Sequence, residues 1–268
     1  MSDQFDKSLP FTCALVTGGG GGLGKAIATY LLSKGKKVII AGRTESTLRQ
    51  TAQEIGAADS YVLDTGDISQ IPTFVQKVTT KYPDLDCLIN NAGVQRPLSV
   101  LNDDPTEFLA KADQEININV RGPMHLTLGL LEHFKSHPHG ATIMNVSSIL
   151  AFVPFSIQNP VYNGTKAWLH FWSMTLRSQL SRGGYEKIRV IEIAPPSVGT
   201  DLHRDREDPD DNSKEKNPNA LSVEEFMGFF AEGLEGGESV IAPGMSRDVV
   251  DLWYKDFGGL YERLSGGV

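Results

Sequence analysis

Tyr162 and Lys166 lie four positions apart in a stretch, Tyr162–Ser181, whose apolar spacing predicts a helix. Side chains four apart share one helix face. A nearby ammonium stabilises a phenolate and lowers the phenol pKa from about 10, so such a tyrosine can exchange protons near neutral pH. Because a pair with this spacing can equally be a structural contact, the residues that accompany it decide between the two interpretations.

Further polar side chains follow the predicted strands. Asn90-Asn91-Ala92-Gly93 comes after the strand Leu85–Ile89, and Ser147-Ser148 comes after the strand Ala141–Val146. Asn119 falls in a helical stretch. Ligands bind at the carboxyl ends of parallel strands, so these groups are candidates for one shared site.

A run of five glycines, Gly18–Gly22, followed by Gly24, separates the first predicted strand from the first predicted helix. Without Cβ atoms, the backbone can approach a pyrophosphate closely, and a helix N-terminus offers free N–H groups and partial positive charge. In this strand–loop–helix context the glycines predict a dinucleotide site rather than a flexible turn.

The end of the second predicted strand indicates which dinucleotide binds. An acidic residue usually stands there to bind the ribose 2′-hydroxyl, but the sequence has Arg43. A guanidinium suits a 2′-phosphate in charge and geometry, so NADP(H) is favoured over NAD(H). Glu45 keeps the alternative open, since a small loop shift could bring it to the ribose. Asp64 is placed to meet the adenine amino group or to cap a helix.

Short apolar runs alternate with amphipathic stretches along the chain. The predicted strands are Phe11–Thr17, Lys37–Ala41, Ser60–Leu63, Leu85–Ile89, Ala141–Val146, Ile188–Ile193 and a short one near Ser239–Ala242. The predicted helices are Gly24–Lys34, Thr44–Ile55, Ile68–Tyr82, a long one within Asp104–His133, Tyr162–Ser181, Ser222–Leu234 and a C-terminal tail. This alternation predicts an α/β fold: one doubly wound domain over residues 1–268, with a parallel sheet of about seven strands and helices on both faces.

One segment interrupts the pattern. Residues 203–219 contain no apolar side chain, so we expect an exposed, mobile insertion within a substrate lid spanning about 202–230. A linker to a second domain is less consistent with the sequence, because the remainder is too short for its own core.

Composition excludes several classes of protein. The chain has 268 residues and a net charge of −8, which argues against nucleic acids and anionic membranes as partners. No apolar run reaches the roughly 20 residues of a membrane span, and the polar start lacks a secretory signal. Two cysteines form no metal cluster or disulfide framework. The sequence therefore predicts a cytoplasmic protein without a metal site.

The motifs together resemble the short-chain dehydrogenase/reductase family, in its compact one-domain form with a Rossmann fold. The resemblance rests on Thr17–Gly24, Asn90–Gly93, Asn119, Ser148 and Tyr162-x-x-x-Lys166, and on a turn from Pro195 to Thr200. It covers about residues 11–200.

The resemblance implies a role for each matching residue. Tyr162 is the general acid/base, Lys166 tunes it and holds the nicotinamide ribose, and Ser148 bonds the substrate oxygen, with Ser147 as the alternative. Asn119 holds a water that links Lys166 to solvent. The implied cofactor contacts are Gly18, Gly20, Gly22, Leu23, Gly24, Arg43, Thr44, Asp64, Thr65, Asn91, Ala92, Gly93, Tyr162, Lys166, Pro195, Val198 and Thr200.

We therefore expect an NADP(H)-dependent carbonyl reductase or alcohol dehydrogenase. Two alternatives remain: a catalytically silent NADP(H)-sensing protein, and an epimerase or dehydratase that retains its cofactor. The predicted pocket walls suggest a neutral, moderately hydrophobic substrate; they are Gln95, Leu150, Phe152, Pro154, Phe155, Pro160 and Ser197. The family implies a homodimer or homotetramer formed through the helices that carry Asn119 and Tyr162.

Overall fold

The computed structural model describes residues 9–265. Its sheet has seven parallel strands in the order β3-β2-β1-β4-β5-β6-β7. The strands are β1 (Cys13–Thr17), β2 (Lys37–Gly42), β3 (Asp59–Val62), β4 (Leu85–Asn90), β5 (Ala141–Val146), β6 (Ile188–Ile193) and β7 (Val240–Ile241). The predicted doubly wound sheet is confirmed. The order changes direction between β1 and β4, which is where such sheets open a crevice for a ligand.

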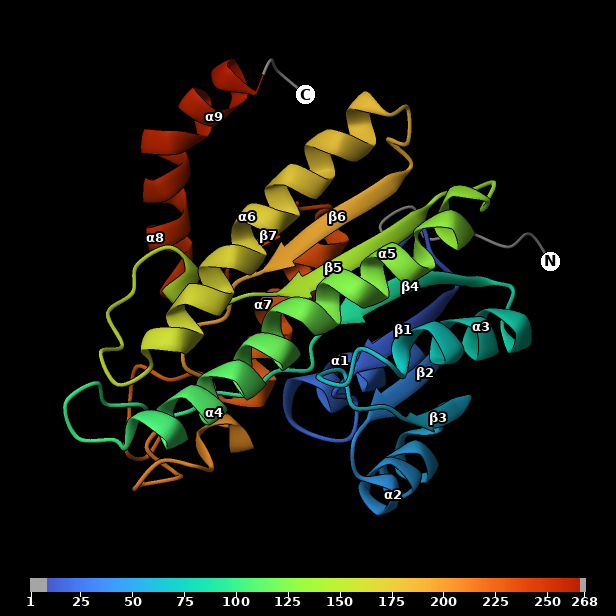
Figure 1. The fold of residues 1–268 in the computed structure, drawn as a ribbon. Helices are drawn as coiled ribbons and strands as arrows, with labels where there is room; N and C mark the ends of the chain where they lie inside the picture. The colour runs from blue at the N-terminus through green and yellow to red at the C-terminus, as the bar shows by residue number, and fades with distance from the viewer. Residues whose placement is uncertain (1–8, 266–268) are drawn as a thin grey trace.

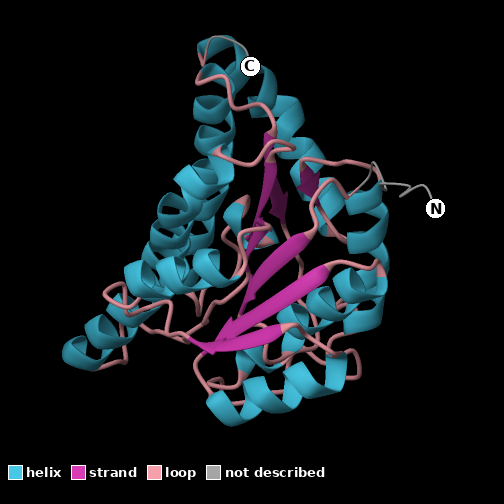
Figure 2. Cartoon of the chain, turned by 90° about the vertical axis from the view of Figure 1, so that its right-hand side faces the viewer, coloured by secondary structure: helices cyan, strands magenta, loops and turns pink. Residues whose placement is uncertain are grey.

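The helices lie in two layers, one on each face of the sheet (Figures 1 and 2). One layer contains α1 (Gly22–Ser33), α2 (Glu45–Ile55) and α7 (Val223–Glu235). The other contains α3 (Ile71–Lys81), α5 (Gly122–Lys135) and α6 (Pro160–Arg182). The remaining helical segments are α4 (Pro105–Ile116), η1 (Asn117–Arg121), η2 (Ile149–Ala151), η3 (Asp201–His203), α8 (Ser246–Trp253), η4 (Tyr254–Gly258) and α9 (Gly259–Leu264).

Strand residues alternate between the two cores. In β1, Ala14 and Val16 face α1 and α7, whereas Cys13 and Leu15 face α3 and α5. All four are fully buried. Parallel strands covered on both faces need apolar residues at every position, which explains why β1 appears in the sequence as an unbroken apolar run.

Most residues of the segment 203–219 are exposed, as predicted for an insertion, but His203 and Asn212 are buried. Asn212 donates from Nδ2 to the carbonyl oxygens of Val198 and Thr200, at 2.8 and 2.9 Å. The prediction was wrong here because an apolar count does not register polar groups that are buried by satisfying backbone carbonyls.

The capped start of α7 and the C-terminal helices agree with the expected elements. Ser222 and Glu225 form a capping box, since each side chain accepts a hydrogen bond from the other residue's backbone N–H. Helices α8 and α9, with η4 between them, run beside α6 (Figure 1), where Tyr261 contacts Ser178. Within residues 9–265, no helix is both long and apolar enough to cross a membrane.

Candidate active site

A cavity of about 610 Å³ lies at the carboxyl ends of the central strands. This volume falls within the usual range for small-molecule sites. Its lining joins the loops after β1, β2, β4 and β5 to the start of α6 and the segment after β6. Residues from distant parts of the sequence therefore meet at the topological switch point of the sheet.

One end of the cavity is the glycine turn between β1 and α1. Gly18 and Gly22 have φ of +65° and +50°, which side chains other than glycine adopt with strain. A Cβ at Gly24 would lie 2.3 Å from the Gly18 carbonyl oxygen. Gly21, the N-cap of α1, makes no side-chain cap, and the first turn carries no acidic residue. The first-turn N–H groups and the positive end of the helix dipole are thus available to an anion.

The loop after β4 holds this turn in place. Asn91 donates from Nδ2 to the carbonyl oxygen of Thr17 at 2.9 Å, and the Thr17 hydroxyl accepts from the backbone N–H groups of Asn91 and Ala92 at 3.0 Å. Thr17 and Asn91 therefore fix the distance between the ends of β1 and β4, which border the crevice.

The residues after β2 and β3 also reach the cavity. Arg43 lies in its lining and has no ion-pair partner among the described residues. Glu45, the alternative ribose ligand, instead pairs with Arg49 on the exposed face of α2. Asp64 lines the cavity while accepting from the Gly66 N–H at 2.9 Å. A free guanidinium at this edge can receive a phosphate.

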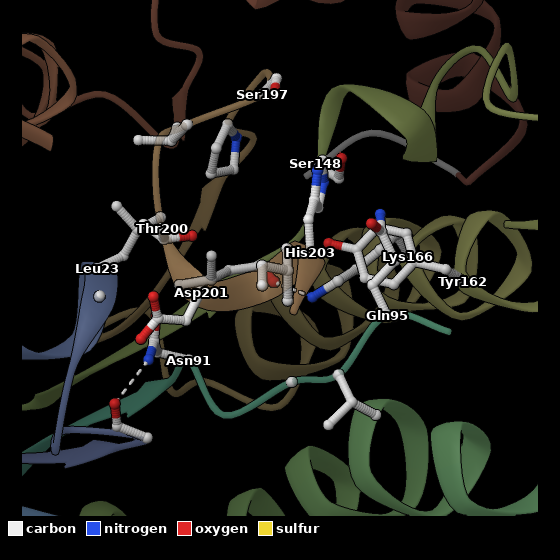
Figure 3. A pocket seen from close by; sticks show the side chains of 18 of the residues that line it. Leu23, Asn91, Gln95, Ser148, Tyr162, Lys166, Ser197, Thr200, Asp201 and His203 are labelled. Atoms are coloured by element: carbon white, nitrogen blue, oxygen red, sulfur yellow. Dashed lines mark hydrogen bonds between the residues drawn. The ribbon is translucent and has the colours of Figure 1, made fainter. Parts of the chain in front are cut away.

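The polar groups expected to do chemistry meet at the other end. Ser148, Tyr162 and Lys166 lie together on one side of Figure 3, with Leu23 and Thr200 on the opposite side. All three of these polar residues are buried. The Ser148 hydroxyl lies close to the Tyr162 hydroxyl, and its Oγ accepts a hydrogen bond from the Leu150 N–H at 3.1 Å.

Ser147 also lines the cavity, but its hydroxyl is used elsewhere. It donates to Glu192 Oε1 at 2.5 Å, and Glu192 Oε2 is 2.8 Å from His170 Nδ1. Glu192 and His170 are fully buried. The Ser147 hydroxyl is therefore engaged by Glu192, whereas the Ser148 hydroxyl remains beside Tyr162 in the cavity.

The ionisation of Tyr162 differs from the sequence expectation. Burial raises the pKa of this phenol, the charge of Glu115 raises it further, and the Ser148 hydrogen bond and the Arg206 charge oppose the rise. Burial lowers the pKa of Lys166 to about 8, against an opposing effect of Glu115. The Lys166 Nζ lies 5.4 Å from the centre of the Tyr162 ring. At neutral pH the phenol is therefore protonated and suited to donate a proton.

Asn119 does not line the cavity itself. It lies in η1, where its side chain pairs with the backbone of Val94 through Oδ1 at 2.9 Å and Nδ2 at 2.8 Å. Its Nδ2 also donates to Thr165 Oγ1 at 3.2 Å. The side chain thus joins the loop after β4 to the helix that carries Tyr162 and Lys166.

The lid segment contributes polar groups that the sequence analysis missed. Arg206 lines the cavity and donates to Gln95 Oε1 at 2.7 Å and Asn159 Oδ1 at 3.0 Å. Arg206 and His203 both pair with Asp211. Because the polar segment 203–219 has no hydrophobic periodicity, the sequence did not indicate that these charged side chains would line the cavity.

Most of the expected cofactor contacts line this cavity, but Gly20, Gly24 and Thr44 do not. Among the expected pocket walls, Gln95, Leu150, Phe155 and Ser197 are present, whereas Phe152, Pro154 and Pro160 are not. Phe152 packs instead against His170, with ring centroids 4.3 Å apart. The expectation of largely apolar walls was therefore wrong on the lid side. Among the described residues, no group of three His, Cys, Asp or Glu could hold a metal ion.

This fold places the chain among the Rossmann-type α/β proteins, and comparison with known proteins gives its family. The model of the short chain dehydrogenase family matches residues 12–211. The chain belongs to this family and is an oxidoreductase of the short-chain dehydrogenase/reductase type.

Three relatives are similar over nearly the whole chain. The uncharacterized oxidoreductase DltE of Bacillus subtilis is 35% identical over 251 residues, which cover 94% of this chain and 95% of DltE. A short chain dehydrogenase from Burkholderia cenocepacia in complex with NADP has a TM-score of 0.73 at 26% identity, covering 95% and 97% of the two chains. A 3-ketoacyl-(acyl-carrier-protein) reductase from Brucella melitensis complexed with NADH has the same score and identity, covering 85% and 94%.

Proposed function

We propose that this protein is an NADP(H)-dependent carbonyl reductase or alcohol dehydrogenase in which Tyr162 is the general acid/base. The observation that carries the proposal is one cavity holding both a glycine turn with a free arginine and the buried group Ser148, Tyr162 and Lys166. The whole chain would act as one nucleotide-binding and catalytic domain.

The nucleotide half of the cavity fits a dinucleotide phosphate. The turn from Gly18 to Gly22 and the start of α1 would hold the pyrophosphate, and Asp64 and Thr65 would lie at the adenine side. When bound there, a nicotinamide nucleotide supplies or accepts the hydride.

Arg43 supports a preference for the phosphorylated nucleotide. Its guanidinium lines the cavity, while Glu45 is engaged with Arg49. A carboxylate at this place would bind a ribose hydroxyl, whereas a free guanidinium binds a phosphate. Two relatives at 26% identity carry NADP and NADH respectively, so the preference has to come from this chain's own residues.

The chemical half of the cavity supplies proton transfer and orientation. The Ser148 hydroxyl would donate to the substrate carbonyl oxygen and hold it beside Tyr162. Tyr162 would then give its proton to that oxygen as the alcohol forms, and in the reverse direction the phenolate would take it back. Lys166 would hold the nicotinamide ribose and supply positive charge behind the phenol.

The lid side of the cavity widens the choice of substrate beyond a purely apolar ketone. Arg206, His203 and Gln95 line it together with Leu150 and Phe155. A carbonyl compound that carries both an apolar part and a hydrogen-bonding substituent matches this mixed lining.

Assembly and location are further parts of the proposal. Exposed apolar side chains on the long helices, such as Leu109, Leu128 and Phe171, offer a face for a homodimer or homotetramer. Size-exclusion chromatography with light scattering measures this state. The cytoplasmic location stays a prediction.

The proposed function is tested with the purified chain, either NADPH or NADH, and a panel of aldehydes and ketones with and without polar substituents. We expect loss of nicotinamide absorbance at 340 nm, faster with NADPH. Tyr162→Phe should lower turnover by roughly 100-fold or more and leave nucleotide binding intact, since general acid–base catalysis contributes about that much. Tyr185→Phe, a more exposed tyrosine, is the control. Full activity of Tyr162→Phe would exclude the proposed mechanism.

A further inference from the structure

Glu115 is a fully buried carboxyl group that the proposed mechanism does not use. It lies near the end of α4, and its Oε1 accepts a hydrogen bond of 3.0 Å from the backbone N–H of Arg96. Its Oε2 is buried and has no hydrogen-bond partner among the described residues. A buried carboxylate with an unpartnered oxygen is costly, so its position needs a reason.

The surroundings of Glu115 are the residues expected to do chemistry. Asn119 lies one helical turn later and joins this helix to Thr165 in α6, next to Lys166. A Cβ at Gly93 would lie 3.3 Å from Asn119 Oδ1 and 3.7 Å from the Lys166 Nζ, which shows how tightly these elements meet. Helix α4 also packs on α6 (Figure 1).

The charges that face Glu115 come from two elements. Lys166 and Tyr162 face it from α6, and Arg96 faces it from the loop after β4. The Arg96 guanidinium is itself engaged by Gln114 and by Asp205 of the lid. The positive charge of Arg206 from the lid also acts on Tyr162 and lowers its pKa. Glu115 is the negative group in this set that acts on both members of the Tyr162–Lys166 pair.

We propose that Glu115 is a positioning residue whose buried negative charge holds the proton on Tyr162 and so favours the proton-donating, carbonyl-reducing state of the site. The inference rests on the proposed function for Tyr162 and adds a preferred pH range for each direction. It alters the rates in the two directions at a given pH and leaves the overall equilibrium of the reaction unchanged.

The directions of the pKa shifts of Glu115, Tyr162 and Lys166 determine how the Glu115 charge changes the pH dependence of reduction. Burial raises the pKa of Glu115 to about 7, against the opposing effects of Arg96 and Lys166. Above that pH its carboxylate raises the pKa of Tyr162 and of Lys166. Reduction needs protonated Tyr162, so it continues to higher pH with the carboxylate than without it. Below that pH Glu115 is neutral, and its effect disappears.

The test compares pH profiles of kcat/KM for reduction and oxidation in wild type, Glu115→Gln and the control Asp113→Asn. The amide keeps an acceptor for the Arg96 N–H. Asp113 lies on the same helix but is exposed, so its charge is screened. We expect both profiles of Glu115→Gln to move by about one pH unit to lower pH, the usual effect of removing one nearby charge. The Asp113→Asn profiles should coincide with wild type.

Three outcomes decide the matter. The proposal is supported if the kcat/KM profiles of Glu115→Gln move to lower pH and coincide with those of wild type at acidic pH. A uniform loss of rate at all pH values, with no shift, shows a structural role only and overturns it. A shift in the opposite direction also overturns it.

A second measurement uses the wild-type chain and needs no variant to fold. In ¹³C NMR of protein labelled at glutamate carboxyls, we expect one carboxyl that titrates near neutrality. Titration of every glutamate at ordinary acidic values would mean that the Glu115 carboxylate is solvated and its charge screened from Tyr162, and this would overturn the proposal. Because this readout needs no substrate, it remains decisive even if the carbonyl panel fails, and the two proposals can fail separately.

Discussion

Lys166 donates a hydrogen bond of 2.7 Å from Nζ to the carbonyl oxygen of Val146, the last residue of β5. The lysine is only 4% exposed. The bond fixes the ammonium beneath the Tyr162 ring and ties α6 to the carboxyl end of β5, an interior strand. Burial nevertheless disfavours the charged form, which is why the pKa of Lys166 is lowered to about 8.

This lowered pKa predicts a pH-dependent cost in stability. Between pH 8 and 10.5 the unfolded chain holds a proton on Lys166 that the folded chain has released, so wild-type stability rises with pH over that range. Below pH 8 both states are protonated and the cost is constant. Relative to Lys166→Met, wild type should therefore gain on the order of 3 kcal/mol between pH 7.5 and 10.5.

Urea unfolding of the nucleotide-free proteins at several pH values measures this difference. Lys77→Met, at an exposed position on α3, serves as the control and should show no such trend. If the difference in unfolding free energy between wild type and Lys166→Met does not change with pH over this range, burial does not lower the pKa of Lys166. Turnover of Lys166→Met should fall by roughly 100-fold or more in the same preparation, since the charge behind the phenol is lost.

The glycine turn gives a matched pair of substitutions. A Cβ at Gly24 would lie 2.3 Å from the Gly18 carbonyl oxygen, whereas a Cβ at Gly21 has no atom within 4 Å. Gly21 has φ of −170°, extended backbone that any residue adopts. Gly24→Ala should thus displace the turn, lower stability by about 1–3 kcal/mol and weaken NADPH binding, while Gly21→Ala should leave the stability near wild type.

Thermal unfolding and nucleotide titration calorimetry measure both properties on both variants. NADPH binding by Gly24→Ala equal to that of wild type would mean that the turn adapts to a side chain at Gly24. In that case its shape would not explain how the nucleotide is held.

Arg43 and Arg49 provide the corresponding test for nucleotide choice. Arg43→Ala removes the unpaired guanidinium of the cavity edge and should weaken NADPH binding by roughly 10–100-fold, as loss of a charge-assisted hydrogen bond does. NADH binding should hardly change. Arg49→Ala removes an exposed arginine that pairs with Glu45, so it should leave both affinities close to wild type. Equal weakening of NADPH and NADH by Arg43→Ala would refute the 2′-phosphate role.

Much of this fold could be predicted because local patterns carry it. The helix predicted over Thr44–Ile55 is observed at Glu45–Ile55, and the strand predicted at Ile188–Ile193 has those bounds. Apolar periodicity and the glycine turn are local patterns, so both can be recognised in a single sequence. The meeting of Ser148 with Tyr162 was likewise predictable from the family resemblance.

The parts that escaped prediction depend on long-range pairing of polar groups. Asn212 is buried because its amide donates to the carbonyls of Val198 and Thr200. Arg206 is half-buried and donates to Gln95, 111 positions away in the sequence. The burial of Glu115 depends on the Arg96 N–H. Composition marks each of these residues as exposed, since charged side chains are mostly at the surface, and only the fold supplies their partners.

The last prediction concerns Ser147 and Ser148, two adjacent residues of which the first contributes to stability and the second to turnover. The Ser147 hydroxyl bonds the buried Glu192 carboxylate, so Ser147→Ala should lower stability by about 2 kcal/mol and keep most of the turnover. The Ser148 hydroxyl lies beside Tyr162 in the cavity, and it also accepts a hydrogen bond from the backbone N–H of Leu150. Ser148→Ala should therefore lower turnover by about 100-fold and stability by only about 1 kcal/mol.

Each serine variant is the control for the other, with kcat/KM and urea unfolding measured on both. The expected result is a crossed pattern, in which one variant loses stability and the other loses rate. A loss of turnover in Ser147→Ala with an active Ser148→Ala would reverse the assignment. It would mean that Glu192 and His170, rather than Tyr162, direct the hydroxyl that meets the substrate.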